Sequence, residues 1–177
     1  EGFNSTAQAL QGAEMLVRVK PDISQREWAD YVAALDPYLQ QGVVGIGYVQ
    51  RIQRSEIEGL EARQRAEGLT DFKVEQVSSR DQLYVVTRIA PLQRNAAALG
   101  LDIGSGVTRR EAAERAMAAG HMMLSRRIQL IHDNQTVPGF LLLLPVYRSG
   151  AELSTPAGRE QALTGWIYAA LRTNMLM

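Results

Sequence analysis

The chain has 177 residues, of which 46% are apolar and 21% charged, a balance typical of one folded domain or of two small subdomains that share a core. Lysine plus arginine number 19, as do aspartate plus glutamate, and no long basic stripe is present, which excludes nucleic acid as a partner class. Cysteine is absent, which excludes disulfides, thiolate metal sites and cysteine nucleophiles.

Two helices are predicted at the start of the chain. Apolar residues at helical spacing predict an amphipathic helix over 3–19, which Pro21 ends. Ser24 and Glu27 then match a capping box, in which each side chain satisfies an exposed amide at a helix start. We expect this second helix to continue to about Leu39.

A glycine-containing strand follows at 43–49. Gly45 and Gly47 lie on one face of this strand and apolar residues on the other. A nucleotide-binding loop would need its glycines in a turn between a strand and a helix, which these are not. The two glycines are therefore expected to let a helix or a ligand approach the sheet closely.

Two more capping-box patterns, Ser55 with Glu58 and Thr108 with Glu111, predict helices that end at glycines. The leucine run after Gly139 is apolar on both faces, which predicts a central strand. The other expected elements are helices at 55–68 and 108–119, strands at 72–77, 83–89, 122–125, 127–132 and 140–147, an alanine-rich helical turn after Pro91, a glycine-rich loop at 100–106, a short helix within 154–165, and a strand or an exit helix at 166–171.

This order predicts an α+β fold. Each half of the chain has a helix followed by antiparallel strands, which suits two small sensor-like lobes behind a long N-terminal helix. The longest apolar run, 140–146, is far shorter than the roughly 20 residues that a membrane-spanning helix needs. The chain begins at Glu1 without a signal-peptide pattern, so we expect a fragment whose membrane anchors lie outside it.

Catalytic and metal-binding patterns are incomplete. His121 and His132 lack a third convergent ligand, and we expect both to be solvent-facing turn residues. Ser105 between two glycines is only a fragment of the Gly-x-Ser-x-Gly motif, without an identifiable base. The sequence therefore predicts no catalytic residues, no metal and no cofactor.

Arg109 and Arg110 stand in the first turn of a predicted helix, where cations oppose the helix dipole. One explanation is solvation or a salt bridge to Glu111 or Glu114. The other is that Arg109 and the exposed helix amides meet an anionic or acceptor-rich ligand.

An ordered set of short patterns resembles the CHASE domain family over most of the chain. The most diagnostic are the Leu-Asp pair before the capped helix and the Gly-x5-Pro-Val-Tyr ending. The set is Gly45-Ile46-Gly47-Tyr48 with Arg51, then Tyr84, Pro91, Asn95, Gly100-Leu101-Asp102, Gln129-Leu130 and Gly139 to Pro145-Val146-Tyr147.

The resemblance implies an extracytoplasmic, periplasmic sensor that lies between two transmembrane helices and controls a cytoplasmic histidine kinase, diguanylate cyclase or adenylyl cyclase. It implies a helical stalk at 1–41 and a sensor core at 42–177, with two PAS-like subdomains that have antiparallel sheets. The membrane-distal lobe would cover about 42–147, and the membrane-proximal part about 148–177 with the N-terminal helices. The implied assembly is a homodimer that binds a small molecule.

The resemblance also implies a ligand site. In the related plant cytokinin receptors an aspartate near the start of the capped helix binds adenine, and Arg109 stands at that place. Because a guanidinium can only donate hydrogen bonds, an adenine-type ligand is not expected. Ile131 stands where a leucine backbone contacts the ligand, Ser125 where a threonine supports the pocket, and Leu143 where a threonine binds the ligand tail. The walls would be Val85, Val86 and Ile103.

These positions predict a pocket that is apolar opposite Arg109 and suits a small organic acid or an amphipathic signal. Two other classes stay open. One is a periplasmic protein-interaction or structural module without a small-molecule pocket. The other is a hydrolase, for which the sequence supplies no convergent nucleophile and base.

Overall fold

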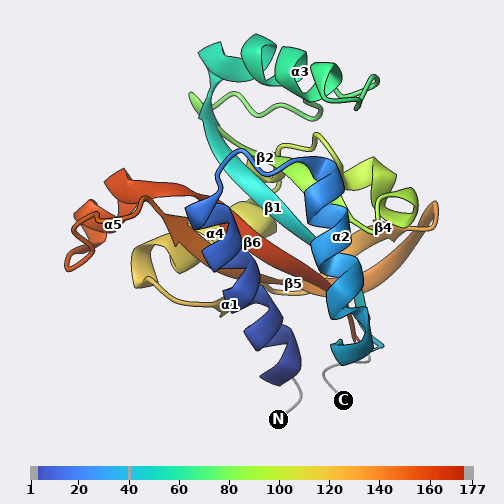
Figure 1. The fold of residues 1–177 in the computed structure, drawn as a ribbon. Coiled ribbons are helices and arrows are strands. Elements are labelled where there is room, and N and C mark those ends of the chain that lie inside the picture. The colour runs from blue at the N-terminus through green and yellow to red at the C-terminus, as the bar shows by residue number, and fades with distance from the viewer. Residues whose placement is uncertain (1–3, 40, 174–177) are drawn as a thin grey trace.

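A six-stranded antiparallel sheet forms the centre of the protein, and helices cover both of its faces (Figure 1). The computed structural model describes residues 4–39 and 41–173. The strand order is β2-β1-β6-β5-β3, and β4 also pairs with β5. The strands are β1 (Val43–Gln53), β2 (Gln82–Ala90), β3 (Met123–Leu124), β4 (Ile128–His132), β5 (Gln135–Tyr147) and β6 (Leu163–Arg172). The α-helices are α1 (Asn4–Val19), α2 (Gln25–Leu35), α3 (Ile57–Ala66), α4 (Val107–Ala119) and α5 (Pro156–Ala162).

The last strand joins the two halves of the sheet. β6 pairs with β1 on one side and with β5 on the other, and the segment 166–171 is therefore strand rather than exit helix. The α+β class is confirmed, but the prediction of two PAS-like subdomains is not, because the described strands belong to one sheet. The leucine run is confirmed as a central strand, with Leu141 and Leu143 facing one core and Leu142 the other.

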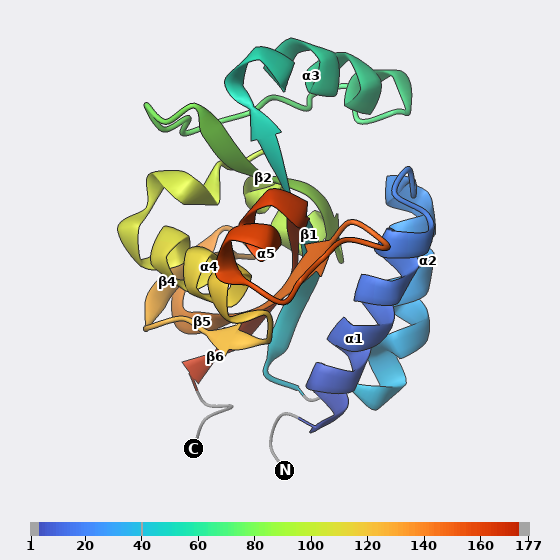
Figure 2. The same ribbon diagram turned by 90° about the vertical axis from the view of Figure 1, so that its left-hand side faces the viewer.

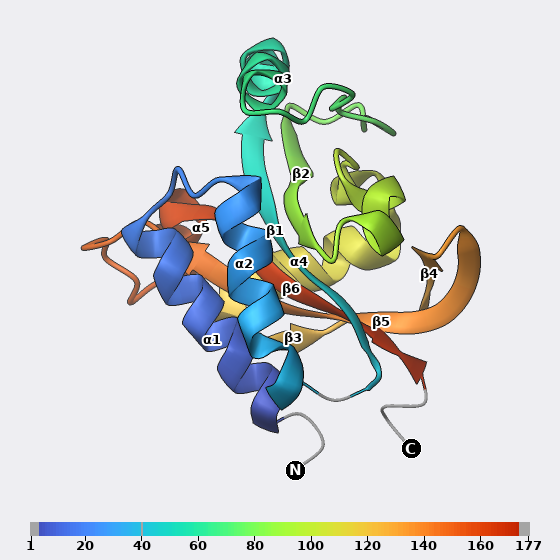
Figure 3. The same ribbon diagram turned by 45° about the vertical axis from the view of Figure 1, so that its right-hand side comes forward.

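Helices α1 and α2 cover one face of the sheet (Figure 3). Leu10 and Trp28 are fully buried against this face, and the indole Nε1 of Trp28 donates to the carbonyl of Ile46 at 3.0 Å. The capping box is confirmed: Ser24 Oγ accepts from the Glu27 amide at 3.0 Å, and the Glu27 carboxylate accepts from the Ser24 amide at 2.9 Å. The predicted helix start at Phe3 lies outside the described residues.

The opposite face is covered by α4, by two short 3-10 segments, Gln93–Ala98 and Ile103–Ser105, and by β4 (Figure 2). Ala113 and Ala116 are fully buried, and their small side chains let α4 lie close to the sheet. The indole Nε1 of Trp166 donates to the carbonyl of Ala113 at 2.8 Å, which ties β6 to the helix.

Helix α3 covers the far end of β1 and β2, away from the start of α1 and the end of β6 (Figures 1 and 2). The predicted strand at 72–77 is wrong, although Phe72 and Val74 are buried there. The amide of Val74 donates to the Glu61 carboxylate, and Glu75 forms only an isolated bridge with the loop at 100–102. Tertiary hydrogen bonds replace a strand ladder in this segment.

The other two predicted capping boxes are wrong. Helix α4 begins after Gly106, so Thr108 already lies within the helix and does not cap it. Helix α3 follows a 3-10 turn at Arg54–Glu56, whose Glu56 carboxylate accepts from the Gln53 amide at 2.6 Å. No helix in the described ranges is both long enough and apolar enough to cross a membrane.

Candidate ligand-binding site

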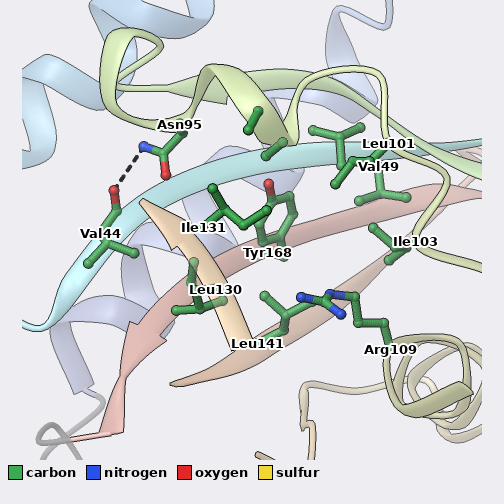
Figure 4. Close-up of a pocket in the computed structure, with 14 residues that line it drawn as sticks. Val44, Val49, Asn95, Leu101, Ile103, Arg109, Leu130, Ile131, Leu141 and Tyr168 are labelled. Atoms are coloured by element: carbon green, nitrogen blue, oxygen red, sulfur yellow. Dashed lines mark hydrogen bonds between the residues drawn. The ribbon is translucent and has the colours of Figure 1, made fainter. Parts of the chain in front are cut away.

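A cavity lies between the α4-covered face of the sheet, the two 3-10 segments and β4 (Figure 4). The cavity volume is about 70 Å³, whereas a single water molecule needs only about 15 Å³ on the same measure. It is lined by Val44, Val49, Val86, Asn95, Ala97, Ala98, Leu101, Ile103, Arg109, Leu130, Ile131, Leu141, Tyr168 and Ala170. Every lining residue except Asn95, Arg109 and Tyr168 is apolar.

Four of the site residues expected from sequence line this cavity. Val86 and Ile103 belong to its walls, Arg109 reaches it from the first turn of α4, and Ile131 lies at β4 with 48% of its surface exposed. These residues come from four separate segments of the chain. The fold therefore brings them together.

The other three expected residues lie outside the lining. Val85 precedes Val86 on β2, so its side chain faces the opposite way, into the cluster beneath α3. Leu143 is fully buried in the core. Ser125 is also buried, and its hydroxyl accepts from the Leu141 amide at 2.9 Å and donates to the Arg126 carbonyl at 2.7 Å.

Arg109 extends along the apolar wall without a carboxylate partner in the described part of the chain (Figure 4). Its Nη2 donates to the carbonyl of Gln129 at 2.7 Å. The salt bridges considered from sequence do not form, because Glu111 contacts Arg126 instead and Glu114 binds Arg80. Burial lowers the pKa of the Arg109 guanidinium, and only Tyr168 opposes this shift.

Tyr168 lines the cavity but was not among the site residues expected from the sequence. Its side chain is 5% exposed, and its hydroxyl points into the cavity (Figure 4). This hydroxyl has no hydrogen-bond partner within residues 4–39 and 41–173. Burial raises the pKa of the phenol, while the nearby Arg109 charge lowers it by a smaller amount. Tyr168 pairs with Gly47 on β1, and a tyrosine opposite a strand glycine is the signal that could have identified it.

Gly45 and Gly47 make room for the polar residues of the cavity. A Cβ on Gly47 would lie 2.6 Å from the Tyr168 ring, and one on Gly45 would lie 3.0 Å from the Asn95 amide nitrogen. The expected close approach is therefore made by two cavity-lining side chains of the protein itself.

Asn95 fixes the 3-10 segment over the cavity and is fully engaged. Its Nδ2 donates to the carbonyls of Val44 at 3.0 Å and Pro91 at 2.8 Å. Its Oδ1 lies 3.3 Å from Nδ1 of His132. Because the amide orientation is set by its two carbonyl acceptors, Nδ1 of the neutral histidine carries the proton in this contact.

Asp102 holds the loop before α4. The residue is 1% exposed. Its carboxylate accepts hydrogen bonds from the amides of Ser78, Tyr84 and Gly104, each at 2.9 Å. These bonds place the following residue, Ile103, in the cavity wall. The Leu-Asp pattern of the sequence thus has a structural role here.

The remaining chemical candidates do not converge. His132 is 4% exposed, so its expected solvent-facing position is wrong, whereas His121 is exposed. No metal-binding cluster of three histidine, aspartate or glutamate residues exists within the described ranges. The Ser105 hydroxyl donates to the backbone carbonyl of Asp102.

Comparison with known proteins adds one finding. A model of the CHASE domain family matches residues 21–177, nearly the whole chain. No curated protein gives a significant match. Since the match extends from before α2 to the end of the chain, this protein belongs to the CHASE domain family, whose members are non-catalytic extracytoplasmic sensor domains of receptors.

Proposed function

We propose that this domain senses a small anionic or acceptor-rich molecule, which binds in the cavity between Arg109 and the apolar walls. The observation that carries the proposal is the half-buried Arg109 guanidinium, which faces an apolar cavity without a carboxylate among the described residues. Burying a cation without an opposite charge beside it is costly, whereas a bound anion would offset that cost. A cation in the first turn of a helix is also disfavoured unless something negative compensates.

The proposed output is a shift of the N-terminal helices. Val86 of β2 lines the cavity, and two residues later Arg88 donates from Nε to the carbonyl of Ile23 at 2.9 Å. Gln25, the first residue of α2, donates to the carbonyl of Ile89 at 2.7 Å. Movement of β2 on ligand binding would therefore reach α2 through polar contacts that cross from strand to helix.

The proposed setting is a periplasmic sensor in a homodimeric receptor with a cytoplasmic histidine kinase or nucleotide cyclase. The start of α1 and the end of β6 lie at the same end of the molecule (Figures 1 and 3). This arrangement suits a domain whose flanking segments enter one membrane. Signalling then requires a ligand that binds two conformations of the dimer with different affinity.

A thermal-shift screen against a metabolite library tests the binding proposal. Arg109→Ala is compared with Arg115→Ala, which removes an exposed arginine from the same helix. We expect at least one ligand to raise the melting temperature of the wild type and of Arg115→Ala but not of Arg109→Ala. A screen without hits, or hits that are unchanged in Arg109→Ala, would contradict the proposal.

A further inference from the structure

We infer that the ligand is a small monocarboxylate with a compact hydrocarbon body, whose carboxylate is held jointly by Arg109 and Tyr168. The inference rests on the proposed function, because it assumes that the cavity is a ligand site. It adds the charge and shape of the ligand and a second binding residue. Tyr168 carries the added step, since its hydroxyl enters the cavity without a hydrogen-bond partner within the described residues.

The cavity provides for one negative charge. Arg109 is the one charged residue in its lining, and the lining contains no histidine. The nearby Arg110 is directed elsewhere, because its Nη1 donates to the carbonyl of Gly104 at 2.8 Å. A dicarboxylate or a phosphate dianion would bring a second charge into apolar surroundings without compensation, at a large desolvation cost.

The available donors match a carboxylate. The guanidinium of Arg109 has five N–H groups, and the carbonyl of Gln129 engages one nitrogen. The Tyr168 hydroxyl supplies another donor from the sheet side of the cavity. Asn95 offers no further donor direction, because both of its amide hydrogens are directed to the carbonyls of Val44 and Pro91. A carboxylate can accept from both Arg109 and Tyr168 at once.

The rest of the cavity selects against polar ligand bodies. Its other walls are valine, leucine, isoleucine and alanine side chains, so a hydroxyl or amine on the ligand body would lose its hydration without a new partner. The volume of about 70 Å³ favours a short or branched hydrocarbon chain. The position of Ile131 at the cavity, with 48% of its surface exposed, suggests β4 as the side of entry.

Isothermal titration calorimetry with a matched ligand panel tests the inference. The panel contains short linear and branched monocarboxylates, the primary amide of each acid, dicarboxylates of equal length, and inorganic phosphate. We expect wild-type protein to prefer a monocarboxylate over its amide by about 100-fold, because charge-assisted hydrogen bonds to a buried arginine are lost in the amide.

Tyr168→Phe should weaken binding of the preferred carboxylate about tenfold and reduce the protein's preference for that carboxylate over its amide. The matched control is Tyr48→Phe, which removes the hydroxyl of a buried tyrosine in the core on the opposite face of the sheet. It should leave affinity unchanged. Without ligand, Tyr168→Phe should melt at or above the wild-type temperature, since the hydroxyl has no partner to lose. If the hydroxyl had a merely structural role, its removal would instead lower the melting temperature.

The outcomes separate this inference from the proposed function. Ala98→Phe fills the cavity from its 3-10 rim, where Ala98 is half-buried, and should abolish binding of any cavity ligand. If a neutral or doubly charged ligand binds best and Ala98→Phe abolishes that binding, the monocarboxylate inference fails and the proposed function stands. If a monocarboxylate binds equally to Tyr168→Phe, the role of Tyr168 fails. If nothing binds the wild type, or if Ala98→Phe binds normally, both proposals fail.

Discussion

Replacing Gly47 by alanine tests whether the glycines of β1 create the cavity. The added Cβ would lie 2.6 Å from Cε2 of Tyr168 and 2.7 Å from the carbonyl oxygen of Arg88. The ring contact could be relieved by a shift of Tyr168, but the carbonyl belongs to the paired backbone of β2 and cannot move independently. Overpacking of this kind costs about 1–3 kcal/mol. For a domain of this size the melting temperature should fall by about 2–12 °C.

Two other glycines calibrate this prediction. A Cβ on Gly45 would first meet the Asn95 side chain at 3.0 Å, so Gly45→Ala should cost less, about 1 kcal/mol or below. Gly59 is exposed within α3, where its nearest neighbour is the end of the flexible Arg63 side chain at 3.3 Å. Gly59→Ala should stabilise the protein by about 0.5–1 kcal/mol through helix propensity.

Urea and thermal unfolding of the three variants measure this order directly. Ligand titration of Gly47→Ala should also show weaker binding, because the displaced Tyr168 ring would enter the cavity. The argument is refuted if Gly47→Ala is as stable as the wild type, or if Gly45→Ala is the more damaging change.

Three further predictions address pH, signalling and the cavity wall. Burial lowers the pKa of the His132 imidazole below its ordinary value, so the unfolded chain takes up the proton first, and stability should fall as pH drops below about 6.5. Unfolding of His132→Gln from pH 8 to 5 should show a shallower decline in stability. Gln25→Ala should leave ligand affinity within about twofold but reduce ligand-induced hydrogen-exchange protection of α2, because the hydrogen bond to the Ile89 carbonyl is lost. Unchanged protection would contradict the proposed path from the cavity through β2 to α2. Val86→Ala should weaken ligand binding, whereas Val85→Ala, on the opposite face, should cost about 2 kcal/mol of stability without a direct change in affinity, as titration and urea unfolding would measure.

Local patterns predicted most elements of the fold, because their signals are contained in short segments. The apolar stripe of α1, the capping box at Ser24 and the leucine run of β5 all have the expected structures. The patterns failed where the same short pattern is compatible with two local structures. Thr108 and Glu111 have capping-box spacing but lie inside the first turn of α4. At 72–77 the apolar side chains are buried as expected, but long-range hydrogen bonds determine the backbone conformation.

The candidate site was predictable only in part, because position in a motif does not determine which way a side chain faces. Val85 and Val86 were both expected in the walls, yet successive residues of a strand face opposite sides. Tyr168 was missed for a different reason. Its strand, β6, is last in the chain but lies between β1 and β5, so its neighbour Gly47 is more than a hundred residues away in sequence.

The connection between the cavity and α2 depends on one extra residue in β2. Val49 pairs with Val86 and Tyr48 with Arg88, which leaves Thr87 as a β-bulge. The bulge changes the alternation of the strand, so that Val86 faces the cavity while Arg88 faces α2. The Thr87 hydroxyl is shielded from solvent and has no hydrogen-bond partner in the described ranges, a feature that lowers stability. Without the bulge, Arg88 would share the cavity face with Val86, and the strand would no longer link the proposed ligand to the N-terminal helices.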